Sequence, residues 1–266
     1  MALQIDLSGR VALVTGVSDG IGVGIARKLA EAGCDVAGCA RRAADSEEAA
    51  RFHDIVQSQG CKSFYDRIDV SEPDGPDRFV ANSVGALGRI DIVVSNAGRN
   101  VFTGVNDSTE DDWRQCMELD LASHWRLGKA AQPHMAKAAS DRASPVFVIN
   151  SSNHAFSTLP GCFPYNVAKA GLVAMTQSMA LEWGPAVRAV CIAPGFIDTP
   201  GGDKWFETFP DPAAKRREVE QAHPVGRIGT SDEIGGICAF LASEYAAFIS
   251  GSTILIDGGH ATHMGW

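Results

Sequence analysis

A short apolar strand that runs straight into a glycine-rich turn constrains the fold of this chain more than any other feature. Residues Val11–Thr15 are followed at once by Gly-Val-Ser-Asp-Gly-Ile-Gly at residues 16–22, and then by a helical pattern. Gly16 permits a tight turn, Gly20 lets backbone approach a pyrophosphate, and Gly22 allows close packing of the helix. The free N–H groups at the start of the helix favour a bound anion. Such a segment can be only a turn, but its place between strand and helix predicts a dinucleotide-binding loop.

The rest of the chain alternates short apolar runs with longer helical patterns. Expected strands are Arg10–Thr15, Asp35–Ala40, Ser63–Asp69, Ile90–Ser95, Pro145–Asn150, Val187–Ala193 and Thr253–Ile256. Expected helices are Gly22–Ala32, Ser46–Gln59, Pro76–Leu87, Asp111–Lys137, Tyr165–Trp183 and Ser231–Ala242. This alternation predicts right-handed crossovers and an α/β fold, with a parallel, doubly wound sheet of about seven strands flanked by helices. No repeat or linker interrupts the pattern, so residues 1–266 are expected to form a single domain.

One segment, residues 196–227, departs from the alternation. It contains Pro200, Pro210, Pro212 and Pro224, with aromatic residues between them. An irregular stretch of this length inside a compact domain is usually functional. We therefore expect residues 196–227, called the lid segment below, to cover a substrate site. A peripheral helical excursion with ordinary packing is the alternative.

The charge balance narrows the possible partners. Of the 266 residues, 23 are Lys or Arg and 32 are Asp or Glu, which gives a formal net charge of −9. A nucleic-acid binder or an anionic-membrane binder needs a basic face, so neither class is expected. No apolar run approaches the roughly 18 residues of a membrane span, and the N-terminus lacks a signal pattern. We expect a cytoplasmic protein that acts on a small molecule.

Cysteine and histidine spacing gives no sign of disulfides or of a metal centre. The seven cysteines form no CxxC pair, and most lie in apolar runs, where a free thiol packs as a small hydrophobe. His260 and His263 have i,i+3 spacing, but no third ligand is evident. We expect reduced thiols, no metal, and a packing role for the two histidines.

Further motifs follow in order along the chain. Ser-Asn-Ala-Gly occupies residues 95–98, Asn-Ser-Ser residues 150–152, Tyr-Asn-Val-Ala-Lys residues 165–169, Pro-Gly residues 194–195 and Asp-Gly-Gly residues 257–259. Together with Thr-Gly-x-x-x-Gly-x-Gly at residues 15–22, this series resembles the short-chain dehydrogenase/reductase family, over residues 8 to about 260. The resemblance implies a single-domain Rossmann-type fold and an NAD(P)-dependent oxidoreductase that interconverts a secondary alcohol and a ketone. A dinucleotide-binding sensor is the non-enzyme alternative, but such a protein is expected to lose Ser152, Tyr165 or Lys169.

Tyr165 is the expected acid/base of this reaction. An unperturbed phenol has a pKa near 10, which is too high for an efficient base at neutral pH. Lys169 lies four residues later, on the same helical face. A cation about 4 Å away contributes up to roughly 4 kcal/mol at an effective dielectric of 20, so we expect Lys169 to lower the phenol pKa. Ser152 is expected to hydrogen-bond the reacting oxygen, and the resemblance implies that Lys169 also holds the nicotinamide ribose. Taken alone, Tyr165 could equally be a buried aromatic residue without a catalytic role. Lys169, taken alone, could be a charged residue on a solvated helix face.

One position departs from the family pattern. The family usually places an asparagine in the long helix after the fourth strand, and Asp120 takes its place here. The family residue acts largely through its backbone carbonyl, so the resemblance implies that Asp120 keeps a catalytic relay role. Its carboxylate would also ion-pair or take up protons, which predicts an altered pH profile.

The resemblance also implies a cofactor site. Its members here are Gly16, Ser18, Asp19, Gly20, Ile21, Gly22, Arg41, Asp69, Val70, Asn96, Ala97, Gly98, Tyr165, Lys169, Pro194, Gly195, Ile197 and Thr199. NAD-specific relatives commonly carry an acidic residue at the end of the second strand, where this chain has Ala40, Arg41 and Arg42. The two guanidinium groups suit a 2′-phosphate, while Asp19 would repel one. The balance favours NADP and leaves NAD open; the arginines are otherwise solvated loop charges.

The residues expected to line the substrate mouth are polar. Besides Ser152 and Tyr165, they are Arg99, Asn100, Asn153 and His154. Hydrogen-bonding side chains suit a sugar, a polyol or a sugar acid, and the guanidinium of Arg99 suits a carboxylate unless it faces solvent. An NADPH-dependent ketoreductase for 3-oxoacyl or other carbonyl compounds is the alternative. By resemblance, the helices at residues 111–137 and 165–183 pair subunits in a homotetramer.

Overall fold

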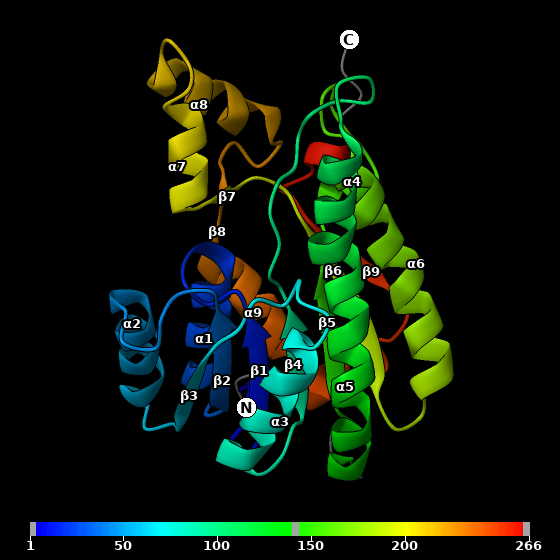
Figure 1. Cartoon of the computed structure of the whole chain (residues 1–266). Coiled ribbons are helices and arrows are strands. Elements are labelled where there is room, and N and C mark those ends of the chain that lie inside the picture. The colour runs from blue at the N-terminus through cyan, green and yellow to red at the C-terminus, as the bar shows by residue number, and fades with distance from the viewer. Residues whose placement is uncertain (1–3, 140–143, 263–266) are drawn as a thin grey trace.

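A seven-stranded parallel sheet forms the centre of the computed structural model, which describes residues 4–139 and 144–262 (Figure 1). The strands lie in the order β3-β2-β1-β4-β5-β6-β9, and every neighbouring pair is parallel. They are β1 Val11–Thr15, β2 Asp35–Ala40, β3 Ser63–Arg67, β4 Ile92–Ser95, β5 Val146–Asn150, β6 Arg188–Pro194 and β9 Thr253–Ile256. The expected α/β fold with a parallel sheet of seven strands is confirmed.

Helices cover both faces of this sheet. The main ones are α1 Gly20–Glu31, α2 Glu47–Gln57, α3 Gly75–Leu87, α5 Ser123–Ala138, α6 Tyr165–Trp183 and α9 Ser231–Ala242. One apolar core lies under α1, α2 and α9, and the other under α3, α5 and α6. Successive residues of a strand point to opposite faces of the sheet, so Val14 packs into the first core and Leu13 into the second. Within the described parts of the chain, no helix combines the length and the apolar character needed to cross a bilayer.

The winding direction of the chain reverses between β1 and β4. From β1 the chain moves outward to β2 and β3, and it then returns to β4 on the other side of β1. In open sheets of this kind, ligands bind beside the carboxyl ends of the strands at such a reversal. The glycine-rich turn leaves β1 at this point, and the motif at residues 95–98 leaves β4. The fold therefore brings the two motifs together.

The single long helix expected over Asp111–Lys137 is wrong. The chain forms α4 Glu110–Met117, then a π-helical turn over Glu118–Ala122, and then α5. A capping box between Thr109 and Asp112 starts α4. Such wide turns occur mostly as short interruptions, frequently at functional sites. This one contains Asp120, which is completely buried.

The lid segment is largely helical rather than irregular. It holds β7 Ile197–Asp198, α7 Pro200–Phe206 and α8 Pro212–Ala222, and β8 Gly229–Thr230 follows it and pairs with β7. Each helix begins with a proline behind a capping side chain, from Thr199 in α7 and from Asp211 in α8. Both helices stand clear of the sheet at the top of the view (Figure 1). Pro200 and Pro212 therefore mark helix starts, although the density of prolines in this segment is typical of a loop.

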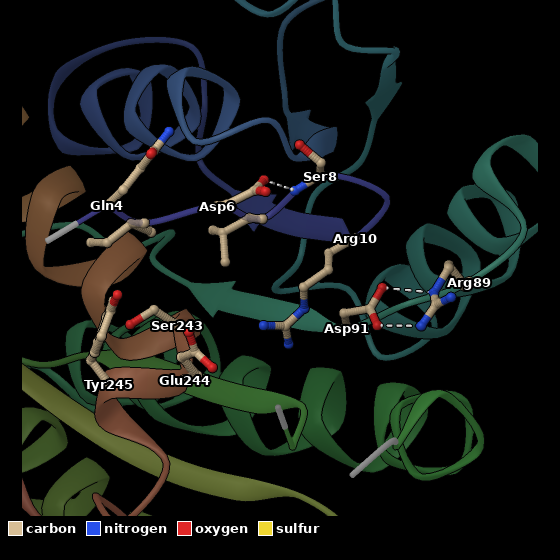
Figure 2. Close-up of a pocket in the computed structure, with 11 residues that line it drawn as sticks. Gln4, Asp6, Ser8, Arg10, Arg89, Asp91, Ser243, Glu244 and Tyr245 are labelled. Carbon is tan, nitrogen blue, oxygen red and sulfur yellow. Dashed lines mark hydrogen bonds and ion pairs between the residues drawn. The ribbon is translucent and has the colours of Figure 1, made fainter. Parts of the chain in front are cut away.

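The amino-terminal edge of the sheet is fixed by charged groups around a hollow of about 360 Å³ (Figure 2). Asp91, next to the start of β4, is buried and accepts hydrogen bonds from Arg89 at 2.7 and 2.9 Å and from the backbone of Val11 at 2.9 Å. Arg10 donates to the carbonyl of Ala242 at the end of α9. These contacts join β1, β4 and α9 at the edge opposite the motifs.

Candidate active site

Three positions of the glycine-rich turn leave no room for a side chain or require the backbone freedom of glycine. Gly16 and Gly20 have φ angles of 77° and 57°, in the left-handed region that favours glycine. A Cβ on Gly22 would lie 2.0 Å from the carbonyl oxygen of Gly16, so only glycine lets the helix start this close to the turn. The result is a cradle of bare backbone at the N-terminus of α1, which fits a dinucleotide pyrophosphate.

A polar network ties three strand ends together behind this cradle. The side-chain amide of Asn96 donates to the carbonyl of Thr15 at 2.9 Å, and the Thr15 hydroxyl accepts from the backbone N–H groups of Asn96 and Ala97 at 2.9 and 3.0 Å. Asn150, the last residue of β5, donates to Asn96 at 2.8 Å. The ends of β1, β4 and β5 are therefore held in one fixed arrangement.

The structure brings the three expected catalytic side chains together. Ser152 follows β5, Tyr165 is the first residue of α6, and Lys169 lies one turn further along that helix. All three are buried. The Lys169 ammonium lies 5.3 Å from the centre of the Tyr165 ring, and a hydrogen bond from Ser152 acts to lower the pKa of Tyr165. Lys169 also donates to the carbonyl of Asn150 at 3.4 Å, which fixes it beneath the end of β5.

Asp120 contacts the catalytic lysine through its side chain. Its Oδ1 lies 3.4 Å from Nζ of Lys169 and accepts the backbone N–H of Arg99 at 3.0 Å. A Cβ on Gly98 would lie 2.6 Å from the same oxygen, so a larger residue there would displace the carboxylate. Burial raises the pKa of Asp120, and Lys169 opposes that effect. Asp120 and Lys169 thus form a buried ion pair, which requires both partners because removing one leaves an uncompensated charge.

Burial dominates the ionisation of Tyr165. Removal from water raises the pKa of its phenol, the Lys169 ammonium lowers it, and the Asp120 carboxylate raises it again. The expected lowering of the phenol pKa by Lys169 is confirmed in direction, but burial outweighs it and the net pKa lies above the ordinary value. Burial lowers the pKa of Lys169, but Tyr165 and Asp120 outweigh burial and the net pKa is raised. The cluster therefore favours a neutral phenol beside an ammonium.

The other expected cofactor residues lie along the same edge of the sheet. They are found at or after the ends of β3 (Asp69, Val70), β4 (Asn96, Ala97, Gly98) and β6 (Pro194, Gly195, Ile197, Thr199). Thr199 rests on the glycine-rich turn, because a Cβ on Gly20 would lie 3.2 Å from its methyl group. A hollow of about 290 Å³, lined partly by Asp19, Asp198 and Pro200, separates the turn from the base of the lid segment.

The basic residues near the cofactor site include one that sequence reasoning missed. Arg41 and Arg42 are exposed, and Nε of Arg42 lies 3.3 Å from Glu48. Arg51, on α2, donates to the carbonyl of Ser18 within the glycine-rich turn. Helical periodicity indicates that Arg51 is a surface residue, but it does not reveal that the side chain reaches a turn 33 residues away.

The expected substrate residues fall into two groups. Asn153 is buried beside Ser152, and the half-buried His154 has its ring 6.1 Å from the Tyr165 ring. Phe102 packs against both rings. Arg99 and Asn100 are exposed, and Arg99 donates to Gln115 of α4 at 2.9 Å. The structure thus brings Asn153 and His154 to the catalytic cluster and leaves Arg99 and Asn100 at the surface.

A second missed residue comes from the far end of the chain. Nδ1 of His260 lies 3.2 Å from the amide nitrogen of Asn153, although the two are 107 residues apart. His260 therefore does more than pack, because it also makes a polar contact with a residue of the site. His263 lies outside the described residues. Among the residues that the structure describes, no cluster of His, Cys, Asp or Glu suits a metal ion.

Comparisons with known proteins agree with this arrangement. A family model described as enoyl-(acyl carrier protein) reductase matches residues 16–261. Dehydrogenase/reductase SDR family member 4 of Bos taurus is 35% identical over 266 residues, which cover 99% of this chain and 91% of that protein. NADP-dependent mannitol dehydrogenase of Hypocrea jecorina is 33% identical over 260 residues, covering 96% and 94%. The ligand-free structure of Thermoplasma acidophilum aldohexose dehydrogenase has a TM-score of 0.88 at 27% identity, over 99% and 98% of the two chains.

The similarity extends over the whole fold and includes the segments that form the site. The matched residues 16–261 contain the cradle, the Ser152–Tyr165–Lys169 cluster and the lid segment. The chain belongs to the short-chain dehydrogenase/reductase family, whose members are oxidoreductases that act on CH–OH groups.

Proposed function

We propose that this protein is an NAD(P)-dependent oxidoreductase that interconverts a secondary alcohol and a ketone in a sugar, a polyol or a sugar acid. The observation that carries the proposal is the buried cluster of Ser152, Tyr165 and Lys169 beside the cradle. A bound nicotinamide supplies or accepts a hydride, and the chain must move the proton and hold the reacting oxygen.

The protonation states of the cluster support the following division of these tasks. Tyr165 is neutral beside the Lys169 ammonium, so its hydroxyl gives a proton to a ketone oxygen in the reductive direction and takes one back in the oxidative direction. Ser152 holds the reacting oxygen and stabilises the charge that develops on it. Asp120, through its ion pair, keeps the lysine charged and fixed.

The bare-backbone cradle supports dinucleotide binding, and the arginines favour NADP over NAD. Arg41, Arg42 and Arg51 bring positive charge to the region between the end of β2 and the glycine-rich turn. A guanidinium group suits the 2′-phosphate that distinguishes NADP. The exposed carboxylate of Asp19, in the turn, would repel a 2′-phosphate, so NAD remains a candidate cofactor.

The substrate class is supported by polar side chains and by two relatives. Asn153 and His154 lie beside Ser152 and Tyr165 and offer hydrogen bonds to hydroxyl groups. The relatives named mannitol dehydrogenase and aldohexose dehydrogenase act on polyols and sugars. Arg99 lies at the surface, where it donates a hydrogen bond to Gln115. If the substrate is a sugar acid, we propose that Arg99 binds its carboxylate.

The second candidate is an NADPH-dependent ketoreductase for 3-oxoacyl or other carbonyl compounds. It is favoured by the description of the matching family model and by Phe102, an exposed aromatic side chain packed against Tyr165. An apolar substrate would cover Phe102, whereas a sugar acid would engage Asn153 and Arg99.

We further propose that the chain forms one catalytic domain, with the lid segment over the substrate, and that it assembles as a homotetramer. Thr199, at the start of α7, touches the glycine-rich turn, so movement of the lid segment would reach the cofactor site directly. Large apolar side chains are exposed on the helices expected at the subunit contacts, among them Trp125 on α5 and Leu181 on α6, which are 49% and 85% exposed.

A substrate panel tests the function. Purified protein is assayed with NADP and NAD against mannitol, glucose and gluconate, and with NADPH and NADH against fructose, an acetoacetyl thioester and an aromatic ketone. Turnover fastest on the polyol, sugar or sugar-acid compounds supports the first proposal. Faster turnover of the thioester or the aromatic ketone supports the alternative, and no turnover of any compound contradicts both.

A variant separates the enzyme from a dinucleotide sensor. Tyr165→Phe removes the proton donor and keeps the ring, so we expect turnover to be lost while cofactor binding, followed by fluorescence titration, is kept. Unchanged turnover in this variant would exclude the proposed chemistry.

A further inference from the structure

A chain of polar contacts leads from Ser152 to the C-terminal part of the fold. The Ser152 hydroxyl donates to Oδ1 of Asn153 at 3.4 Å and accepts the backbone N–H of His154 at 3.2 Å. Nδ2 of Asn153 lies 3.2 Å from Nδ1 of His260, whose ring packs on His223 with 4.7 Å between centroids. Ser152 and Asn153 are 7% and 6% exposed, so the protein itself must satisfy most of their hydrogen bonds.

The amide of Asn153 links the hydrogen positions of its two neighbours, because one end donates and the other accepts. With Nδ2 toward His260, Nδ1 of that ring must accept, and Ser152 gives its hydrogen to Oδ1. With the amide turned over, Nδ1 of His260 must carry a hydrogen, and Ser152 must accept one from Nδ2. Both orientations keep the contacts of Asn153 with Ser152 and with His260, so the hydrogen on Nδ1 of His260 selects between them.

The two orientations present different faces of Ser152 to a substrate. A hydroxyl has one hydrogen and two lone pairs, and the His154 N–H already uses one lone pair. In the first orientation the hydrogen is held by Asn153, so Ser152 offers only its remaining lone pair to Tyr165 and to the reacting oxygen. In the second, both lone pairs are used by His154 and Asn153, and the hydrogen is free to point toward Tyr165 and the reacting oxygen. A ketone oxygen or an alkoxide accepts hydrogen bonds, so only the second orientation stabilises it.

We propose that Asn153 and His260 are positioning residues that set the direction of the Ser152 hydroxyl during the reaction. The inference rests on the proposed function, because it requires Ser152 to contact the reacting oxygen. Asn153 acts through Ser152, and His260 acts through Asn153.

Several titratable groups surround His260. His223 packs on the ring from the end of α8, and His154 lies close enough for the charge on His260 to oppose its protonation. Asp257 accepts the backbone N–H of His260 at 3.0 Å through its carbonyl, while its carboxylate accepts those of Gly259 and Ala261.

Two substitutions of similar shape at position 153 give opposite constraints. In Asn153→Asp the carboxylate only accepts, so Ser152 must keep its hydrogen turned away from the substrate. We expect kcat/KM to fall about 10²-fold, close to the effect of Ser152→Ala and to the loss of one oxyanion donor. In Asn153→Leu nothing holds the hydrogen, so we expect a loss of less than about tenfold. The assay follows NADPH oxidation with the carbonyl compound that the unaltered protein reduces fastest.

Which of the two variants, Asn153→Asp or Asn153→Leu, loses more kcat/KM distinguishes an orienting role of Asn153 from a packing role. A role in packing or solvation alone predicts that Asp, which keeps the polarity of Asn, does less harm than Leu. Equal losses, or a larger loss in Asn153→Leu, would therefore overturn the inference. Cofactor dissociation constants and thermal unfolding midpoints, measured for both variants, confirm that the comparison is between folded proteins.

His260→Phe provides an independent test that leaves Asn153 in place. Without the imidazole the amide is no longer fixed, and we expect kcat/KM to fall about threefold to tenfold with cofactor affinity unchanged. No loss would contradict the orienting role of His260. If Ser152→Ala and Tyr165→Phe also retain full turnover, the proposed function fails; if only they abolish it, this inference alone fails.

Discussion

At the scale of single residues, the ion pair between Asp120 and Lys169 distinguishes this site from the family pattern. The family asparagine is neutral, whereas a buried carboxylate here lies 3.4 Å from the ammonium that the chemistry needs. Its negative charge raises the pKa of Tyr165 and counteracts the lysine. Asp120 therefore favours the protonated phenol, so the base form of Tyr165 is reached only at higher pH.

Replacing that charge tests its effect. Asp120→Asn removes a contribution that raises the pKa of Tyr165, so the base form is reached at lower pH. Alcohol oxidation needs the base form, and we expect the rising limb of its pH–rate profile to move to lower pH. Glu118→Gln, the same charge change on a side chain paired with Arg126 at 2.7 Å, is the control and should leave the limb in place. An unmoved limb in Asp120→Asn would refute the assigned role.

Arg51 gives a second prediction at this scale. Its guanidinium reaches the glycine-rich turn, so a cofactor with a 2′-phosphate gains a charged partner that NADH lacks. We expect Arg51→Ala to raise the KM for NADPH roughly tenfold and to leave that for NADH almost unchanged. Arg78→Ala, on the distant α3 and paired with Glu72, should change neither. Equal increases for both cofactors would show that Arg51 supports the turn itself.

Residues that belong to short motifs could be predicted from the sequence, and those that join the site through space could not. The spacing of Tyr165 and Lys169 places them on one helical face, and that geometry is confirmed. Arg51 and His260 carry no local signal, because each reaches the site through tertiary packing. The pKa of Tyr165 was also beyond sequence reasoning, since burial outweighs the charge of Lys169.

At the scale of secondary-structure elements, the contact between α1 and α9 depends on glycine. A Cβ on Gly24 would lie 2.3 Å from the carbonyl oxygen of Ser231, and a Cβ on Gly235 would lie 2.3 Å from that of Gly24. The two helix backbones therefore touch directly. Since α1 begins at the cradle, this contact also fixes the element that carries the cofactor turn.

Adjacent glycines in α9 provide a matched pair of substitutions. Gly235→Ala forces the helices apart, and we expect it to destabilise the fold by about 1–3 kcal/mol. At Gly236 an added Cβ meets nothing within 4 Å, so Gly236→Ala should stabilise the helix by about 0.5–1 kcal/mol. Urea unfolding followed by circular dichroism gives both values. Equal effects of the two substitutions would contradict the importance of the α1–α9 contact.

Element boundaries were predictable where a periodic pattern ended at a clear signal. The bounds of α6 and α9 match the expectation, and α9 begins behind the capping box of Thr230 and Glu233. The π-helical turn at Asp120 was missed because its sequence continues the helical pattern. The helices of the lid segment agree with the alternative of a helical excursion; an irregular stretch was the first expectation because prolines that start helices resemble prolines in loops.

At the scale of the whole molecule, the exposed apolar side chains on α5 and α6 bear on assembly. We expect the protein to elute as a tetramer in size-exclusion chromatography with light scattering. Leu181→Asp, which places a charge at an 85% exposed leucine on α6, should yield smaller species. Val105→Asp, at a 74% exposed valine in a loop, is the control and should leave the tetramer intact. A monomeric unaltered protein, or an unaffected Leu181→Asp variant, would contradict the assembly.

The pairing of β7 with β8 has a consequence for how such a protein diversifies. The strands bring residues 197–198 beside residues 229–230, so the intervening chain leaves the body and returns to it at one point. Trp205, Phe206 and Phe209 pack on one another within that excursion, and Phe196, just before β7, packs on Trp205 and Phe206. The excursion and its base therefore share a small apolar centre. An insert with adjacent ends and internal packing is exchangeable between relatives without disturbing the sheet. Grafting the corresponding segment of a relative would thus transplant substrate preference while the scaffold keeps its cofactor chemistry.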